Sequence, residues 1–241
     1  MRPARRPWGL TLFLLLAFIA FVSLGVWQVQ RMHWKHALIA RVDARVHAAP
    51  VELPSRKRLT AQPPKAIDYL HVKLSGTYAG SQTALVRAAT ELGTGYWTMT
   101  PMHLDSGRTV WVNRGFVPSG TTAAQAGKAT PTGPVSVVGL VRSSEPGGSL
   151  LQSNRPQDDR WYSRDVAALS KERHVTGAAP VFVDAQTETA TSPSGIPRPV
   201  PGLTVIRFPD NHLQYALTWF AMALLSLVGM GLVWRRKTRT V

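Results

Sequence analysis

His212 is the residue of this sequence whose type and position most clearly suggest chemistry. It lies near the start of a charge-free stretch from Asn211 to Trp234, so it falls in the first turn of an expected helix. The helix dipole disfavours a charged imidazole there, and a neutral ring can bind a metal. Aromatic, small and thioether side chains follow at spacings of three and four residues: Tyr215, Ala216, Trp219, Met222 and Ala223. The pattern suits a flat apolar macrocycle held through its iron.

His212 also has a structural interpretation, because histidine and aromatic side chains at a membrane interface often only anchor a helix or bond to a neighbouring domain. Asn211 is expected to cap the helix, with Gln214 completing a variant of the capping box. His33 and His36 lie one helical turn apart. Such a pair can bind copper or zinc, or it can form a polar stripe at an interface. The chain has no cysteine, which excludes thiolate metal sites, disulfides and thiol nucleophiles.

No enzyme motif is present in the sequence. Gly93 and Gly95 are not followed by the rest of a dinucleotide-binding fingerprint, and there is no Walker loop, HExxH or GxSxG. Ser, His and Asp occur without a spacing that indicates a catalytic triad. We therefore expect a protein that is not an enzyme. An extracytoplasmic enzyme on two anchors stays open, and it would need a polar pocket with convergent titratable groups.

The positive charge of the chain lies largely beside its apolar segments. The 241 residues include 28 Lys and Arg against 13 Asp and Glu, which gives a formal charge of +15. Residues 1–30 carry +3, residues 211–241 carry +4, and residues 31–210 carry +8. Nearly half of the excess therefore flanks two apolar runs. This distribution argues against a nucleic-acid-binding protein, although the pI is 11.2.

Two segments are long and apolar enough to span a membrane. The first, Trp8 to Trp27, has 20 residues and is about 30 Å long as a helix; a cleaved signal peptide is its main alternative. We expect a tail at 1–7, spans at 8–30 and 211–234, a domain at 31–210 and a basic tail at 235–241. The basic tails place both termini in the cytoplasm and the domain outside it. The short N-terminal tail favours a bacterial cell membrane over a mitochondrion.

The middle domain is expected to be mostly β, so the fold class is an α+β membrane protein with two transmembrane helices flanking a barrel- or sandwich-like extracytoplasmic domain. Alternating apolar residues and turn signals predict strands at His71–Tyr78, Thr83–Arg87, Gly95–Leu104, Arg108–Phe116, Val135–Arg142, Val181–Asp184 and Leu203–Phe208. The first two of these are expected to pair with each other, and residues 105–107 to form a hairpin loop.

The remaining elements of the domain are less regular. A short helix is predicted from Arg164 to Arg173, with Ser163 as its N-cap, and the first span is expected to continue as a helix to about His47. Stretches rich in Pro, Gly, Ser or Thr predict loops at Pro50–Pro64, Ser119–Pro134 and Gln186–Pro201.

Three groups of residues occur in an order that is found in one known family. The first is Leu24-Gly25-Val26-Trp27-Gln28 with Arg31, Trp34 and Lys35. The second is Gly95-Tyr96 and Thr100-Pro101-Met102, followed by Val110 to Pro118, which includes Asn113, Arg114 and Gly115. The third is Asn211 to Phe220. With the two terminal spans, the chain resembles the Surfeit locus protein 1 family of cytochrome oxidase assembly factors. Phe116 replaces the tryptophan usual in that family.

The resemblance implies that the chain helps to build the haem–copper cytochrome c oxidase. It implies delivery or stabilisation of haem a for the catalytic subunit, with haem a synthase as a further partner and membrane lipid around the spans. His212 is then the axial ligand of the haem iron, and the cofactor lies near Tyr215, Trp219, Trp27 and Arg31.

The two spans are expected to meet at Trp27 and Arg31, and Arg114 and Gly115 to mark a tight turn at a strand end. The alternative is a copper-handling or purely scaffolding assembly factor that binds protein and no haem.

Overall fold

The computed structural model describes residues 8–63, 65–149, 151–189, 198–203 and 210–238, without the side chains of residues 236–238. The chain divides into two compact units. One unit contains residues 1–42 and 206–241 and holds most of the two long helices. The other contains residues 43–205 and holds the sheet. The expected fold class is confirmed, because two apolar helices flank a domain that is mostly sheet.

Both long helices have the length and composition needed to cross a membrane. Helix α1 runs from Trp8 to Val46 and has 39 residues, which corresponds to about 58 Å. It therefore continues well past the predicted span, as expected from the sequence. Helix α5 runs from His212 to Thr238. Most large apolar side chains on both helices are exposed, including Leu12, Phe13, Leu16, Leu217, Leu224 and Leu225. Exposed apolar surface of this kind is typical of helices that face lipid.

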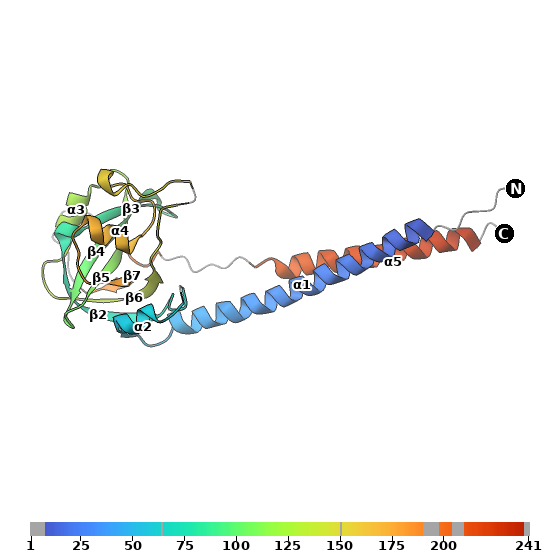
Figure 1. The fold of residues 1–241 in the computed structure, drawn as a ribbon, viewed down its shortest axis with the longest axis horizontal. Coiled ribbons are helices and arrows are strands. Elements are labelled where there is room, and N and C mark those ends of the chain that lie inside the picture. The colour runs from blue at the N-terminus through green and yellow to red at the C-terminus, as the bar shows by residue number, and fades with distance from the viewer. Residues whose placement is uncertain (1–7, 64, 150, 190–197, 204–209, 239–241) are drawn as a thin grey trace. The chain divides into compact units, whose positions relative to one another are not determined.

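The two helices lie side by side and antiparallel (Figure 1). At one end, the rings of Trp8 and Trp234 pack edge to face with centroids 5.5 Å apart, and the Trp234 indole donates to Thr11 Oγ1 at 3.1 Å. Further along, Phe21 stacks on Trp219 with centroids 5.7 Å apart. These contacts fix which residues of α1 face α5.

Gly25 permits close packing between the helices. A methyl group on Gly25 would lie 2.6 Å from the Phe220 ring, so a larger residue would force the ring to move. Gly25 is buried, and so is Gln28 one turn later on the same face. Small residues let neighbouring membrane helices approach closely, and here the approach brings a polar side chain of α1 against α5.

The sheet domain is a closed barrel with extra strands. Its strands are β1 Val51–Glu52, β2 His71–Tyr78, β3 Ala84–Thr90, β4 Gly93–Leu104, β5 Thr109–Pro118, β6 Val135–Ser143 and β7 Ala178–Glu188. Strands β2, β6, β7, β5 and β4 follow one another around a ring, and pairing of β2 with β4 closes it. The sequence left barrel and sandwich open, and the structure is a barrel. The other helices are α2 Arg56–Thr60, α3 Ala123–Lys128 and α4 Val166–Glu172.

The order of strands in the ring defines the type of barrel. Counted along the chain, the five ring strands are arranged first, second, third, fifth, fourth, and the third and fifth are parallel. Helix α3 lies in the chain between the third and fourth. This is the arrangement of an OB-type barrel, in which the face of the second and third strands commonly binds ligands.

That face is covered by the protein's own chain. Met99 of β4 and Trp111 of β5 pack in a buried cluster with Trp161 and with Val166 and Leu169 of α4. A separate cluster that includes Val72, Leu74, Val110, Val112 and Val183 forms the other core. Strand β5 is buried on both faces, so its apolar residues do not alternate with exposed polar ones; even its polar residues Asn113 and Arg114 are buried.

Two details of the domain differ from the predictions. Strand β3 pairs with β4 and not with β2, because the end of β2 pairs instead with the end of β4 to close the ring. The N-cap of α4 is Asp165, whose side chain accepts from the Ala168 amide. The predicted cap, Ser163, instead donates its hydroxyl to the Glu145 carbonyl.

The predicted loops also contain short elements. The stretch Pro50–Pro64 contains β1 and α2, and Ser119–Pro134 contains α3 with a capping box. The start of Gln186–Pro201 belongs to β7. The strand predicted at Leu203–Phe208 lies outside the described residues except for Leu203. The hairpin loop at residues 105–107 is confirmed, with the Gly107 amide donating to the Leu104 carbonyl.

Candidate functional site

The ring of His212 faces α1 at the first residue of α5. Its Nδ1 lies 2.7 Å from Oε1 of Gln28. With the amide oxygen toward the ring, Nδ1 must carry the proton and donate it to Gln28. In a neutral ring with this tautomer, the lone pair is on the second nitrogen, Nε2. Among the described residues, none hydrogen-bonds to Nε2. The contact with Gln28 thus favours the tautomer in which Nε2 can bind a metal.

The backbone of His212 is held by Asp210. The His212 amide donates to Asp210 Oδ1 at 3.1 Å, so this carboxylate binds at the helix N-terminus, where we had expected Asn211 to act. The other oxygen, Oδ2, lies 2.8 Å from His36 Nε2 on α1. The pKa of Asp210 is lowered, first by the hydrogen bond from the His212 amide and then by the nearby cationic groups, which outweigh the cost of burial. Two residues of α1 therefore position His212: Gln28 contacts its ring, and His36 contacts the Asp210 carboxylate that binds its amide.

The aromatic residues predicted around His212 do not share one face. Trp219 is half-buried against Phe21, whereas Tyr215 is 53% exposed. Ala216 and Ala223 are buried against α1. Tyr215 and Ala216 are neighbours in sequence and therefore point about 100° apart around the helix, so Ala216 can pack against α1 while Tyr215 is largely exposed.

The residues of the first motif on α1 also differ in how exposed they are. Trp27 is 54% exposed, whereas Gln28 is 9% exposed and hydrogen-bonds to His212 of α5; the contact of Trp27 with the second span stays a prediction. Arg31 is exposed, with its guanidinium 4.0 Å from the centre of the Trp34 ring. Lys35 is half-buried and contributes to the positive field at Asp210.

His33 and His36 have different surroundings. His36 contacts Asp210, and His33 is exposed. Within the described ranges, no group of three or more His, Asp or Glu residues is arranged to hold a metal ion. A metal role for the two histidines alone stays a prediction.

Arg114 of the second motif lies inside the barrel domain and not at a strand end. It is in the middle of β5 and 2% exposed. Its Nε and Nη2 donate to the two oxygens of Glu188 at 3.1 Å, and its Nη1 donates to Thr130 at 3.0 Å. The guanidinium also lies 5.0 Å from the centre of the Tyr78 ring. Burial, followed by the charge of Glu188, raises the pKa of Tyr78 well above 10.0.

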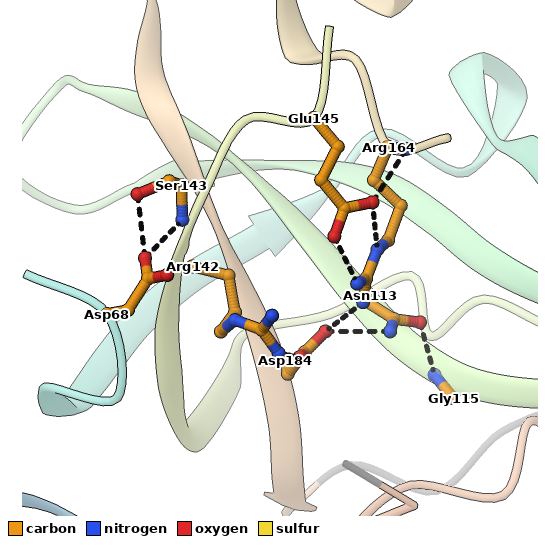
Figure 2. A network of polar contacts seen from close by, with 8 residues as sticks. All are labelled: Asp68, Asn113, Gly115, Arg142, Ser143, Glu145, Arg164 and Asp184. Atoms are coloured by element: carbon orange, nitrogen blue, oxygen red, sulfur yellow. Dashed lines mark hydrogen bonds and ion pairs between the residues drawn. The ribbon is translucent and has the colours of Figure 1, made fainter. Parts of the chain in front are cut away.

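Asn113 joins a second polar network on the opposite face of β5 (Figure 2). Its amide donates to Asp184 Oδ1 at 2.8 Å, and its own oxygen accepts from the Gly115 amide at 3.2 Å. Arg142 and Arg164 each donate to Asp184 at 3.2 Å, and Arg164 also pairs with Glu145. Among the described residues, Arg142 and Arg164 are therefore combined with Asp184 and Glu145 in one ionic network.

Gly115 is required where another segment crosses β5. Its φ is +125°, and a methyl group there would overlap the carbonyl oxygen of Val200. The Phe116 amide donates to that carbonyl at 3.0 Å. The expectation of a tight turn at a strand end is wrong, because the strand continues to Pro118. The reason for the glycine is a close backbone approach.

Two residues of the His212 site had no predicted role. Gln28 was noted only as a motif residue, and Asp210 was not noted at all. The usable signals were an amide one turn after the small residue Gly25 in a charge-free span, and an acidic residue two positions before the helical histidine.

Fold and site together define a class of protein: a small β barrel between two apolar helices that can span a membrane, with a histidine held at the end of the helix pair. The model of the SURF1 family matches residues 15–224. The chain is 36% identical over 227 residues to Surfeit locus protein 1 of Mus musculus, covering 87% of this chain and 71% of the relative. It is 35% identical over 228 residues to that of Homo sapiens, covering 87% and 72%.

A SURF1-like protein of Monosiga brevicollis is 31% identical over 247 residues, covering 97% of this chain and 90% of the relative. The chain belongs to the SURF1 family.

Proposed function

We propose that this chain is a non-enzymatic assembly factor for the haem–copper cytochrome c oxidase and that it holds haem a through His212. The observation that carries the proposal is the contact of 2.7 Å between His212 Nδ1 and Gln28 Oε1. Histidine ligands of metals almost always donate their other ring nitrogen to such a partner, which fixes the tautomer and the orientation of the ring. His212 therefore has the arrangement of an axial ligand.

The surroundings of His212 support an apolar ligand with a charged edge. Trp27, Tyr215 and Trp34 are aromatic and largely exposed at this end of the helices, so they can contact a macrocycle. Arg31 is exposed next to Trp34, and its guanidinium can pair with the propionates. Haem a is the cargo in this proposal, and it supplies the redox and oxygen chemistry of the finished oxidase.

The cellular context of the proposal follows from charge and from family membership. The basic tails place both termini in the cytoplasm and the barrel outside the cell membrane. There the barrel docks the unfinished catalytic subunit, and haem a synthase is the source of the cargo. Membership of the SURF1 family supports these partners, as does the absence of an enzyme motif from the sequence.

The proposal is tested by purifying the protein in detergent from cells that make haem a. The visible spectrum of the wild type should contain a Soret band that is lost or shifted in His212→Ala and unchanged in His103→Ala, a barrel histidine that bonds to Thr109. A colourless wild type would overturn haem carriage. Copper measured on the same sample, with His33→Ala as its control, would instead support the copper-handling alternative.

A further inference from the structure

Gln28 places a polar amide side chain at a buried position, which costs free energy unless the amide is hydrogen-bonded. It lies near the end of the charge-free segment of α1 and is 9% exposed. Burying an amide without a hydrogen bond costs about 1–3 kcal/mol by mutational data. Among the described residues, the ring of His212 is its hydrogen-bond partner. The position therefore serves the histidine or the packing of the helices.

We propose that Gln28 is the positioning residue of the haem site: it fixes the Nδ1–H tautomer of His212 and so presents Nε2 to the iron. This inference rests on the proposed function. Its physical basis is that a neutral imidazole has one proton to place. An acceptor at 2.7 Å from Nδ1 keeps the proton there and makes Nε2 the stronger donor to a metal.

His212 is held at two points, its ring and its backbone amide. The Gln28 oxygen fixes the imidazole, while Asp210, in contact with His36, fixes the amide of the same residue. Gly25, one turn before Gln28, sets how closely the helices approach, because its missing side chain leaves room for Phe220. The close contact of Gln28 with the ring is thus built into the packing of the helix pair.

A purely structural role for Gln28 makes a different prediction. Hydrogen bonds between membrane helices contribute about 0.6–2 kcal/mol to their association, and any buried polar contact could supply that. If this were its only role, replacing Gln28 would weaken the helix pair and leave the chemistry of His212 unchanged. Tautomer and metal affinity separate the two roles.

The first experiment measures the tautomer in the full-length protein without haem. The ¹⁵N shifts of the His212 ring report which nitrogen carries the proton. We expect wild type and Gln28→Glu to hold it on Nδ1, and Gln28→Met, which has similar size but no strong acceptor, to move protons to Nε2. Ser226→Ala is the matched control, since Ser226 is also buried in α5 but donates within its own helix to Met222. An unchanged tautomer in Gln28→Met would overturn the inference.

The second experiment titrates haem a into the same variants. Loss of a partner that orients a ligand typically costs 10–100-fold in metal affinity. Gln28→Met should show a loss of about that size, while Ser226→Ala should bind within about 2-fold of wild type. Gln28→Glu should restore binding and lower the reduction potential of the bound haem, because a carboxylate makes the ring a stronger donor.

The outcomes distinguish this inference from the function on which it rests. A wild type that takes up no haem would overturn the proposed function and with it the role of Gln28. A wild type that binds haem, together with a Gln28→Met variant that binds equally well, would overturn the role of Gln28 alone.

Discussion

The barrel and the helix pair both contain buried polar residues of the family motifs, and they treat those residues differently. In the barrel, each guanidinium nitrogen of Arg114 donates to Glu188 or Thr130. Both ends of the Asn113 amide are bonded as well. In the helix pair, Gln28 hydrogen-bonds to Nδ1 of His212, and none of the described residues hydrogen-bonds to Nε2.

The difference separates motif residues whose polar groups are bonded within the chain from His212, whose Nε2 is available to the ligand that we propose. A buried polar group whose hydrogen bonds are all made within its own chain stabilises the structure and has no donor or acceptor left for a ligand. A ring that is fixed at one nitrogen and unbonded at the other is prepared for a partner from outside the chain. The sequence motifs alone do not make this distinction.

The largest effect on the barrel is expected from Arg114→Met. The change leaves Glu188 without its buried partner, and breaking such a pair costs about 3–5 kcal/mol. Denaturant unfolding of the full-length protein in detergent, followed by near-UV circular dichroism, measures the loss. The double variant Arg114→Met with Glu188→Met should recover most of the stability, because no charge is then left buried. A double variant as unstable as the single one would contradict the importance of the pair.

A smaller loss is expected from Gly115→Ala. The positive φ and the overlap with Val200 should together destabilise the barrel by about 1–3 kcal/mol. Gly133→Ala is the control, since a methyl group there meets nothing within 4 Å. Thermal unfolding of the two variants should separate them clearly. Equal melting temperatures would show that the crossing segment does not constrain β5.

The variant Gly25→Ala tests the difference between the helix pair and the barrel, because it changes the helix pair alone. Its methyl group displaces the Phe220 ring, so the contact between Gln28 and His212 should loosen. We expect weaker haem binding, while the free energy of unfolding of the barrel stays within about 0.5 kcal/mol of wild type. Haem titration and chemical unfolding of the same sample test this. A loss of barrel stability without any change in haem binding would contradict the division between the two regions.

The smallest effect is expected on the stability of the barrel at acidic pH. Burial tends to raise the pKa of Glu145, but the hydrogen bonds and charge of Arg164 prevail and lower it below its ordinary 4.5. The pair therefore stabilises the barrel above about pH 4.5 and loses its contribution as the pH falls through the lowered value. Because Glu145 is partly exposed, the contribution should be about 1 kcal/mol or less. Glu145→Gln should flatten the acid limb of the stability curve, and an unchanged limb would assign the pH dependence elsewhere.

Local patterns predicted the helices and most strands because those elements follow from periodicity. The charge-free stretches and their flanking tryptophans identified both long helices, and the strand at His71–Tyr78 matched β2. The pairing of β3 was predicted wrongly because a hairpin is the default for adjacent strands. Closure of β2 on β4 depends on contacts about 25 residues apart in sequence, which the local pattern does not contain.

The site was predicted only in part for a related reason. His212 could be proposed from helix position and motif, but its partner Gln28 is 184 residues away. Which side of α1 faces α5 depends on the packing of Gly25 and Phe220, so Trp27 and Gln28 could not be distinguished from sequence. Arg114 was placed at a strand end because the strand was predicted to stop at Phe116 with a turn at Gly115, and its partner Glu188 lies 74 residues further along the chain.

The most direct test of the account is a titration of haem a into purified wild-type protein and His212→Ala, repeated with added imidazole. We predict that the variant fails to develop the wild-type Soret band, that imidazole restores it, and that the barrel unfolds at the same denaturant concentration in both proteins. A His212→Ala variant that binds haem a as tightly as wild type, with the same spectrum, would contradict the central claim.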